Sequence, residues 1–407
     1  MRAMSLFASP LHCVDVPFER EGMQLFARIV RSATTAKDAP ALLFLQGGPG
    51  FPSPRERFEW IEYATKRGYQ VVLLDQRGTG RSSRIDRAML DDATIDFTRL
   101  RADTIVDDAE ALRHTLGLAQ WDVLGQSFGG FCLVHYMLRY PESLRAALFT
   151  GGLPSISRGV DEVYEATFAT VRARHQELFE AVPWAQERIA EVCEHLGQRE
   201  EFLPTGERLS ARRFRTIGTL LGQEGGAGTI ATLLEAPFHP NGAMRTDVLA
   251  QIGALVSYES GPLYGVIHES IYGGTVPGAT AWSAQRVAER TPGFGADEGL
   301  LTGEHVFPFQ FDEDPALRPF KQAAHELAAK DDWPNLYAGA SGFNAADHGI
   351  RTAAAVYTQD MYVPRQFSLE TAEALGINVW ENDQMQHDGL RKHGEAVLGA
   401  LLEIVGV

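Results

Sequence analysis

The feature that most constrains this chain of 407 residues is one short turn, Gly125-Gln-Ser-Phe-Gly-Gly130. It follows a strand predicted at residues 121–124 and leads into a helical pattern over residues 128–140. A strand that passes into a helix within so few residues needs glycine wherever a side chain would collide. We expect the turn to expose the Ser127 hydroxyl at the edge of a sheet, at the positive end of the new helix. Chance matches are common in glycine-rich chains, but the flanking strand and helix favour Ser127 as a nucleophile.

Further strand patterns surround this turn. Apolar runs at residues 41–45 and 71–74 each end at a glycine-containing turn, and another run lies at 146–149. Such runs are typical of strands buried on both faces of a parallel sheet. A half-buried strand is indicated at residues 25–30 and a helix at 104–116. This alternation predicts an α/β fold with a mostly parallel central sheet.

The alternation is interrupted in the middle of the chain. Helical patterns and loops replace it there, and residues 160–201, 249–271 and 282–289 carry the helical spacing. Strand patterns return at residues 353–357 and 378–380, and an amphipathic helix is predicted over 389–404. We therefore expect a core built from two segments, residues 1–154 and 334–407, with a helical cap domain inserted at residues 155–333.

Charge and cysteine content exclude several classes of protein. The chain has 37 Lys and Arg against 53 Asp and Glu, a net charge of −16, which argues against binding to nucleic acid or to an anionic membrane. No apolar run approaches the ~18 residues of a membrane helix, and the N-terminus lacks the apolar segment of a signal peptide. Three cysteines are too few for a disulfide framework and favour a cytoplasmic location.

A second glycine-rich turn, Gln46-Gly-Gly-Pro-Gly50, follows the strand predicted at residues 41–45. In chains with a serine turn of this type, the loop after an earlier strand supplies one backbone N–H to an oxyanion hole, and the residue after the serine supplies the other. Here those groups are the amides of Gly48 and Phe128. Each such donor is typically worth ~3 kcal/mol in the transition state.

An activated serine needs a base, and the base needs a carboxylate that orients it. In this topology the chain order is serine, acid, histidine. Asp360 follows the strand predicted at residues 353–357, and His387 lies between the last predicted strand and the last predicted helix. We therefore predict Asp360 as the acid and His387 as the base. The alternatives weighed are His348 and His393 for the base, and Asp383 and Asp388 for the acid.

Cofactor motifs are weak throughout the chain. Gly78-Thr-Gly-Arg-Ser-Ser83 resembles a dinucleotide-binding loop only faintly, because it lacks the third glycine at the required spacing. His268-Glu269 lacks the second histidine of a zinc helix, and Cys193 and His195 have no partner cluster. We expect neither a metal nor another cofactor.

Taken together, these motifs resemble those of the prolyl aminopeptidases (proline iminopeptidases), in their larger bacterial and fungal type. The resemblance covers nearly the whole chain. The matching segments lie at residues 44–51, 75–82, 101–106, 125–130, 268–272, 301–304, 315–320, 360–363 and 386–391.

This resemblance implies an α/β-hydrolase fold and a serine exopeptidase that releases N-terminal proline from peptides. It implies Ser127, Asp360 and His387 as the catalytic residues. It also implies that two carboxylates of the cap, Glu269 and Glu304, hold the substrate's ammonium group through charge-assisted hydrogen bonds. The expected partner is then a small peptide with a free N-terminus.

Two other readings of the same residues are kept open. One is an esterase or amidase on the same scaffold that acts on small uncharged substrates. The other is a binding module without catalysis, which the intact set of Ser127, Asp360 and His387 disfavours. The sequence leaves open whether the chain forms a homo-oligomer, which peptide it meets in the cell, how strict the preference for proline is and whether the cap moves.

Overall fold

Buried apolar strands form the centre of the molecule. The structure, a computed structural model, describes residues 11–36, 38–90, 95–296 and 298–407. Eight strands form one sheet in the order β1-β2-β4-β3-β5-β6-β7-β8. They are β1 Leu11–Arg20, β2 Met23–Ser32, β3 Ala41–Leu45, β4 Gln70–Asp75, β5 Trp121–Gln126, β6 Leu144–Thr150, β7 Arg351–Tyr357 and β8 Val379–Asn382.

The sheet is mostly parallel, as the sequence predicts. β1 and β2 pair antiparallel, and so do β2 and β4. The remaining neighbours, from β4 through β3, β5, β6 and β7 to β8, pair parallel. In a parallel sheet the carboxyl ends of the strands meet at one edge, which is where ligands bind in open α/β sheets.

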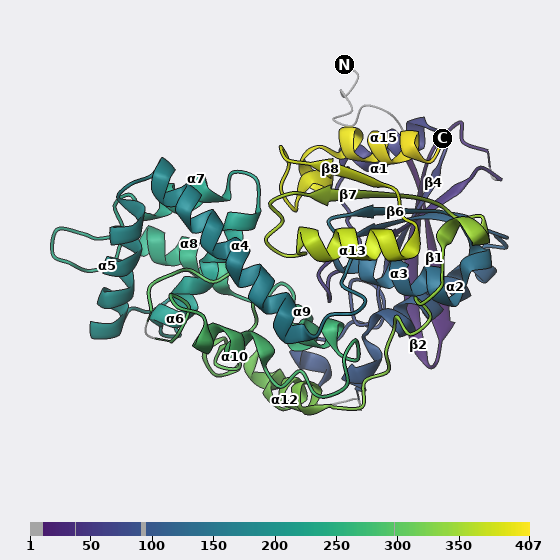
Figure 1. Ribbon diagram of the computed structural model, residues 1–407. Coiled ribbons are helices and arrows are strands. Elements are labelled where there is room, and N and C mark those ends of the chain that lie inside the picture. The colour runs from purple at the N-terminus through teal and green to yellow at the C-terminus, as the bar shows by residue number, and fades with distance from the viewer. Residues whose placement is uncertain (1–10, 37, 91–94, 297) are drawn as a thin grey trace, which may run out of the picture.

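Helices cover both faces of the sheet (Figure 1). Those of the core are α1 Glu59–Lys66, α2 Ala102–Thr115, α3 Phe128–Arg139, α13 Arg365–Leu375, α14 Gly389–Lys392 and α15 Gly394–Ile404. Alternate side chains of β3 enter different apolar clusters. Leu42 and Phe44 pack with α1 and α15, whereas Leu43 and Leu45 pack with α2, α3 and α13. The all-apolar sequence of β3 follows from this burial on both faces.

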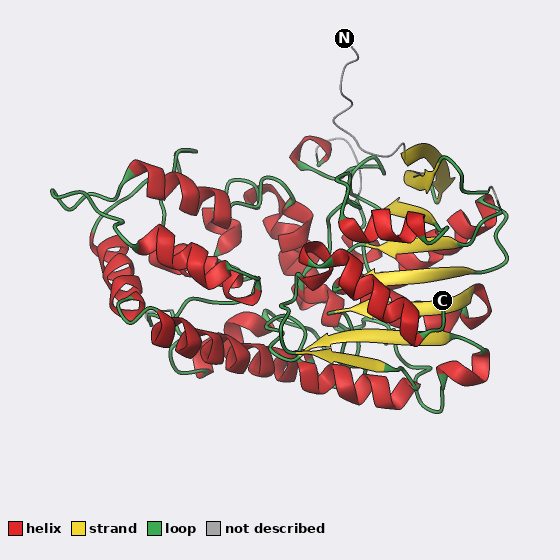
Figure 2. Cartoon of the chain, turned by 90° about the horizontal axis from the view of Figure 1, so that it is seen from above, coloured by secondary structure: helices red, strands yellow, loops and turns green. Residues whose placement is uncertain are grey.

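The described residues between β6 and β7 form helices and contribute no strand to the sheet. This helical insertion lies to one side of the sheet (Figures 1 and 2). Its helices are α4 Val160–Ala181, α5 Ala185–Gln198, α6 Ala211–Arg215, α7 Gly226–Leu234, α8 Thr246–Val256, α9 Pro262–Ile267, α10 Ser283–Arg290, α11 Gln310–Glu313 and α12 Lys321–Ala329.

Three details differ from the sequence expectations. The helix expected over residues 249–271 is interrupted after α8, and α9 begins at Pro262, which suits the first turn of a helix but not its interior. The helix expected over residues 389–404 is divided at His393 into α14 and α15. Strand β1 carries no buried apolar run, since most of its side chains are exposed or half-buried, and it was not predicted.

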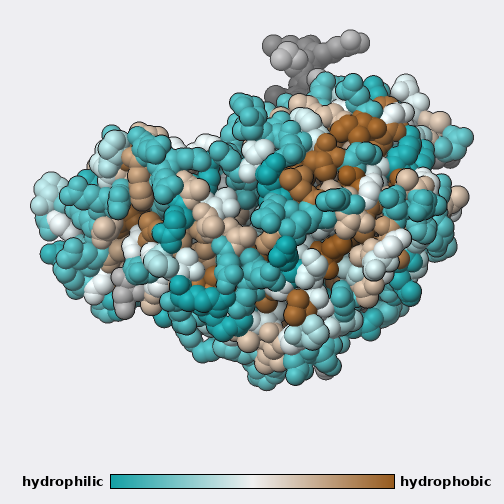
Figure 3. All heavy atoms as spheres, in the orientation of Figure 1, coloured by the Kyte–Doolittle hydropathy of each residue, from teal (hydrophilic) through white to brown (hydrophobic). Residues whose placement is uncertain are grey.

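The surface is mainly hydrophilic, in keeping with the negative net charge. Figure 3 shows hydrophobic residues gathered on the core, over the region of α15 and β8. Ile404 and Val407 are the exposed large hydrophobic residues at that end of the chain.

Candidate active site

Ser127 lies in the sharp turn between β5 and α3. Its backbone has φ 53° and ψ −125°, a region that residues with a side chain rarely adopt. Two hydrogen bonds hold this conformation: the Ser127 N–H donates to Thr150 O (3.1 Å), and the Gly130 N–H donates to Ser127 O (2.7 Å). The strained turn therefore presents the hydroxyl at the carboxyl edge of the sheet, as the motif predicts.

The glycines beside Ser127 allow the backbone segments to approach closely. A Cβ on Gly129 would lie 1.9 Å from Leu45 O, and a Cβ on Gly130 would lie 2.1 Å from Gly152 O. Neither distance is physically possible, because both obstacles are backbone atoms. The motif thus contains glycine where α3 crosses the ends of β3 and β6.

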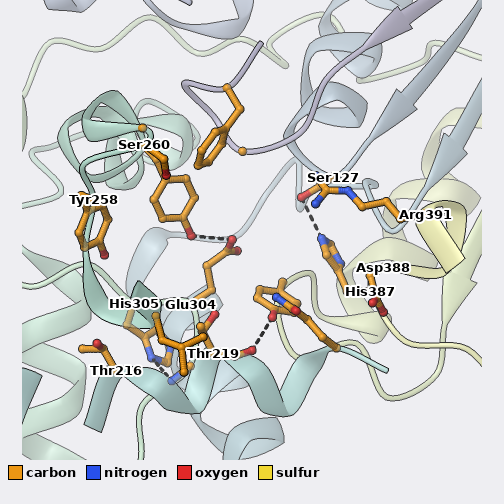
Figure 4. A pocket seen from close by; sticks show the side chains of 18 of the residues that line it. Ser127, Thr216, Thr219, Tyr258, Ser260, Glu304, His305, His387, Asp388 and Arg391 are labelled. Carbon is orange, nitrogen blue, oxygen red and sulfur yellow. Dashed lines mark hydrogen bonds between the residues drawn. The ribbon is translucent and has the colours of Figure 1, made fainter. Parts of the chain in front are cut away.

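Ser127, His387 and Asp360 form one hydrogen-bonded chain (Figure 4). His387 Nε2 lies 3.0 Å from Ser127 Oγ, and His387 Nδ1 lies 2.8 Å from Asp360 Oδ2. A carboxylate only accepts, so Nδ1 carries the hydrogen and Nε2 is free to accept the serine proton. The other carboxyl oxygen, Asp360 Oδ1, accepts from the backbone N–H groups of Tyr362 (2.8 Å) and Val363 (3.0 Å).

The alternative residues lie in other contacts. His348 stacks on Phe343, and His393 pairs with Glu224 at 2.6 Å. Asp388 accepts from the backbone N–H of Glu224 (3.0 Å). Of the histidines and carboxylates weighed from the sequence, the structure therefore brings His387 and Asp360 to Ser127.

The environment of His387 favours the protonated ring that arises during proton transfer. Burial acts to lower its pKa, but the charge and hydrogen bond of Asp360 act in the opposite direction, and the pKa is raised from 6.5. Asp360 therefore orients the ring and stabilises its cationic form.

The two backbone amides predicted for the oxyanion hole lie beside Ser127. Phe128 is the first residue of α3, where backbone N–H groups have no partner within the helix. Gly48 lines the same cavity as Ser127. Its neighbour Gly47 is packed against the turn, since a Cβ there would lie 2.9 Å from Ser127 Cβ.

A cavity of about 450 Å³ opens above Ser127, between the core and the helical insertion. The core contributes Gly48, Ser127 and His387 to its wall. The insertion contributes Tyr264 and Glu304. Figure 4 shows the Glu304 side chain reaching into this cavity from the side opposite His387.

Glu304 contacts Tyr264 of α9 and His268, the residue that follows this helix. The Tyr264 hydroxyl donates to Glu304 Oε1 (2.7 Å), and His268 Nε2 lies 3.6 Å from Glu304 Oε2. Glu304 is half-buried, so one of its oxygens remains available to a ligand in the cavity. Tyr264 and His268 were not singled out for this site from the sequence. Their signal is the i, i+4 spacing that places both on one side of a helical turn.

Glu269 is buried and is not among the residues that line the cavity. Its Oε2 accepts from the backbone N–H of Ala284 (3.2 Å). Burial raises its pKa, and hydrogen bonds from Thr280, Ala284 and Ser283 only partly oppose this shift. The structure thus brings Glu304 to the cavity wall and leaves Glu269 behind it.

Several buried polar atoms near Glu269 lack a hydrogen-bond partner among the described residues. They are Glu269 Oε1, Tyr164 Oη and both ring nitrogens of His268. Burial raises the pKa of Tyr164, and the charges of Glu269 and Glu304 add to the rise, so Tyr164 lies within electrostatic range of both carboxyl groups. Unpaired buried polar atoms are rare in native proteins, and a group of them indicates a place for water or a ligand.

Comparison with known proteins identifies the family. Residues 40–250 match the family model of the alpha/beta hydrolase fold. The chain is 36% identical over 401 residues to a proline iminopeptidase from Aeromonas sobria, covering 95% of this chain and 93% of that protein. The chain belongs to the proline iminopeptidase family. It is also 28% identical over 410 residues to proline iminopeptidase aneH from Aspergillus aculeatus, covering 94% of this chain and 89% of that one.

A solved structure of a proline iminopeptidase from Mycobacterium smegmatis shares 14% identity with the chain, with a TM-score of 0.48 and coverage of 96% and 97%. The fold and family expected from the sequence are confirmed by the match to the alpha/beta hydrolase family model and by the proline iminopeptidase relatives.

Two further observations concern membrane and metal sites in the part of the chain that the structure describes. None of the helices there combines the length and the apolar character needed to cross a bilayer. Among the same residues, no group of three or more His, Cys, Asp and Glu side chains is arranged to hold a metal ion.

Proposed function

We propose that this protein is a serine exopeptidase that releases N-terminal proline from peptides through an acyl-enzyme. The observation that carries the proposal is the hydrogen-bonded chain of Ser127, His387 and Asp360 beneath a cavity whose opposite wall presents Glu304. A nucleophile and a carboxylate that face each other across a small cavity suit a substrate whose reacting carbonyl is close to a positive charge. An N-terminal residue has that chemistry.

In the first half of the reaction His387 Nε2 takes the Ser127 proton, and Oγ attacks the carbonyl carbon of the N-terminal residue. The amides of Gly48 and Phe128 donate to the oxyanion that forms. His387 then gives its proton to the leaving amine, and the C–N bond breaks. In the second half a water molecule, activated by His387, hydrolyses the ester and releases proline.

Recognition of the amine is assigned to the two carboxylates. The ammonium group of an N-terminal proline is secondary and has two N–H groups to donate. Glu304 supplies one acceptor at the cavity wall. We assign the second to the unpaired Oε1 of Glu269, which does not line the cavity, so this contact requires the amine to enter beyond the wall that Glu304 forms. A substrate with a blocked terminus would leave these groups unpaired, which costs affinity.

The helical insertion acts as a cap, for which we keep the bounds 155–333. It contributes Tyr264 and Glu304 to the cavity wall. We infer that Glu304 meets the ammonium group there and leaves no place for a preceding residue, so that the cap makes the enzyme an exopeptidase. We place the protein in the cytoplasm, since its three cysteines are free thiols. Cell fractionation tests the location, and light scattering of the purified protein tests whether it is a monomer or a homo-oligomer.

The decisive assay compares proline arylamide with its N-acetylated form, with alanine and leucine arylamides and with a short-chain ester. We expect fast release from the free proline compound alone. Ser127→Ala should abolish turnover and leave the fold intact. Glu304→Gln should raise KM for proline arylamide by about 10-fold or more, since a charge-assisted hydrogen bond is worth ~1.5–3 kcal/mol.

Glu194→Gln is the matched control, because Glu194 is exposed on α5 and bonds only Gln198 among the described residues. Its KM should equal that of the parent protein. Turnover of the ester without a preference for free proline would instead support an esterase. Such a result would leave the serine chemistry in place and refute the proline specificity.

A further inference from the structure

Two cations on the core side of the cavity have no role in the mechanism above. Arg391 and Lys392 lie on α14, which begins two residues after His387. Both line the cavity, and both are exposed. Within the described residues, neither side chain makes a hydrogen bond or an ion pair, although many other arginines of this acidic chain are paired. Their positive charge is therefore available to a ligand.

Arg391 is directed at the reacting centre. Figure 4 shows its side chain extending from α14 toward Ser127, whereas Glu304 reaches in from the opposite side. Burial and the charge of Arg391 both act to lower the pKa of His387, so the guanidinium is within electrostatic range of the base. The order across the cavity is a negative group, the nucleophile, then a positive group. This order matches a short zwitterion with its scissile carbonyl in the middle.

We propose that Arg391, with Lys392 beside it, binds the C-terminal carboxylate of the substrate, so that the preferred substrates are free dipeptides that begin with proline. This inference rests on the proposed function, because it takes Ser127 as the nucleophile and Glu304 as the site of the ammonium group. The leaving group is then a free amino acid, whose carboxylate stays paired with Arg391 while His387 protonates its amine.

The guanidinium suits this task. Its planar array of N–H groups can bind a carboxylate through two parallel hydrogen bonds. Each further residue moves a carboxylate by ~3.3–3.6 Å, so a cation at a fixed place discriminates peptides by length. Asp388 lines the same cavity and its negative charge opposes a carboxylate there, so the two cations Arg391 and Lys392 must outweigh it.

The test compares prolylglycine with prolylglycinamide, which differ only in the charged terminus, and includes proline arylamide. In the parent protein we expect kcat/KM for the free acid to exceed that for the amide by about fivefold, the upper range for a partly exposed ion pair. In Arg391→Gln the ratio should fall to about one. Arg391→Lys should retain part of it, because lysine keeps the charge but not the paired hydrogen bonds.

Arg245→Gln is the matched control. Arg245 is a partly exposed arginine of the insertion that pairs with Asp247, and it does not line the cavity. In this variant the ratio of kcat/KM for prolylglycine to kcat/KM for prolylglycinamide should equal that of the parent protein. Retained hydrolysis of proline arylamide by Arg391→Gln shows that the variant is folded.

Three outcomes would overturn the inference. The parent protein could show no preference for the free acid, or the preference could survive in Arg391→Gln. The substitution could also change kcat/KM equally for all three substrates with a shifted pH profile, which would mean that Arg391 acts only through His387. In each case hydrolysis of proline arylamide by the parent leaves the proposed function standing. If the parent does not cleave the arylamide, both fail together.

Discussion

At the scale of single residues, the catalytic proposal depends on how protein surroundings change ordinary side chains. His387 is a buried histidine that a carboxylate keeps basic, and Glu269 is a buried glutamate that lacks a matching cation. Both effects follow from the same principle, that burial penalises the charged form unless a partner compensates. Each leads to a measurable dependence on pH.

The acid limb of the pH profile reports on His387. The base must be neutral to accept the serine proton, so kcat/KM should fall as the pH drops through its pKa. Because Asp360 raises that pKa, the midpoint should lie above 6.5. Asp360→Asn should move the limb to lower pH and reduce kcat by about 10⁴-fold. An unchanged midpoint of the acid limb in Asp360→Asn would mean that Asp360 does not raise the pKa of His387.

Glu269→Gln should change how stability depends on pH. Burial raises the pKa of Glu269 in the folded state above 4.5, so the folded chain keeps this proton to a higher pH than the unfolded chain. The stability that this group contributes is therefore lost as the pH rises through its raised pKa in the folded state. We therefore expect the Tm of Glu269→Gln, relative to the Tm of the parent protein, to increase from acid to neutral pH. Curves of Tm against pH that run parallel for the variant and the parent would contradict this expectation. In a separate measurement, a raised KM of the variant for proline arylamide would support the role of Glu269 in binding the amine.

At the scale of elements, helix α3 positions the nucleophile by lying very close to the ends of two strands. The approach depends on glycine, since a side chain at Gly130 would meet the carbonyl of Gly152 beyond β6. The same close contact holds the turn of Ser127, whose N–H donates to Thr150 at the end of β6.

Gly130→Ala should therefore lower both Tm and kcat, because α3 must move away from β6. Gly228→Ala is the matched control on α7, where a Cβ has no atom within 4 Å. Gly228 is an exposed position of this helix, so alanine there should raise the free energy of unfolding by ~1 kcal/mol, the difference in helix propensity between alanine and glycine. Thermal unfolding of both variants should show shifts of opposite sign. Shifts of the same sign would mean that packing at Gly130 is not the cause.

At the scale of the whole molecule, the site exists only where the insertion meets the core. Buried hydrogen bonds anchor the chain where it leaves the core: Ser368 donates to Leu153 O (2.9 Å) and Thr371 donates to Pro154 O (2.6 Å). Nearby, Arg158 pairs with Glu370 on α13 at 3.0 Å. These contacts fasten the first residues of the insertion to helix α13 of the core.

Thr371→Val should reduce the free energy of unfolding by ~1–3 kcal/mol, since it leaves the buried carbonyl of Pro154 without a donor. Thr115→Val is the control, because the Thr115 hydroxyl bonds Ala111 O at an exposed position of α2. Denaturant unfolding of the two variants should show a much larger loss for Thr371. Equal losses would mean that the anchor at Pro154 does not contribute.

Much of the core could be predicted because its strands are short, apolar and bounded by glycine. Residues 41–45 were predicted as a strand, and β3 has those bounds. Strand β1 has no such pattern, because its side chains are mostly exposed and it is a strand only through pairing with β2. Residues 249–271 have helical apolar spacing that continues across a break imposed by Pro262, so the break could not be predicted from the spacing.

The sequence by itself was enough to predict the turn at Ser127, the proposed order of nucleophile, acid and base, and the family. Steric limits at glycine and the chemistry of each residue type act locally, so they can be read along the chain. Only the tertiary structure decided that Glu304 reaches the cavity while Glu269 lies behind it, and that Arg391 extends toward Ser127. These placements depend on how the insertion packs on the core, which brings together side chains far apart in the sequence, and no local pattern records that packing.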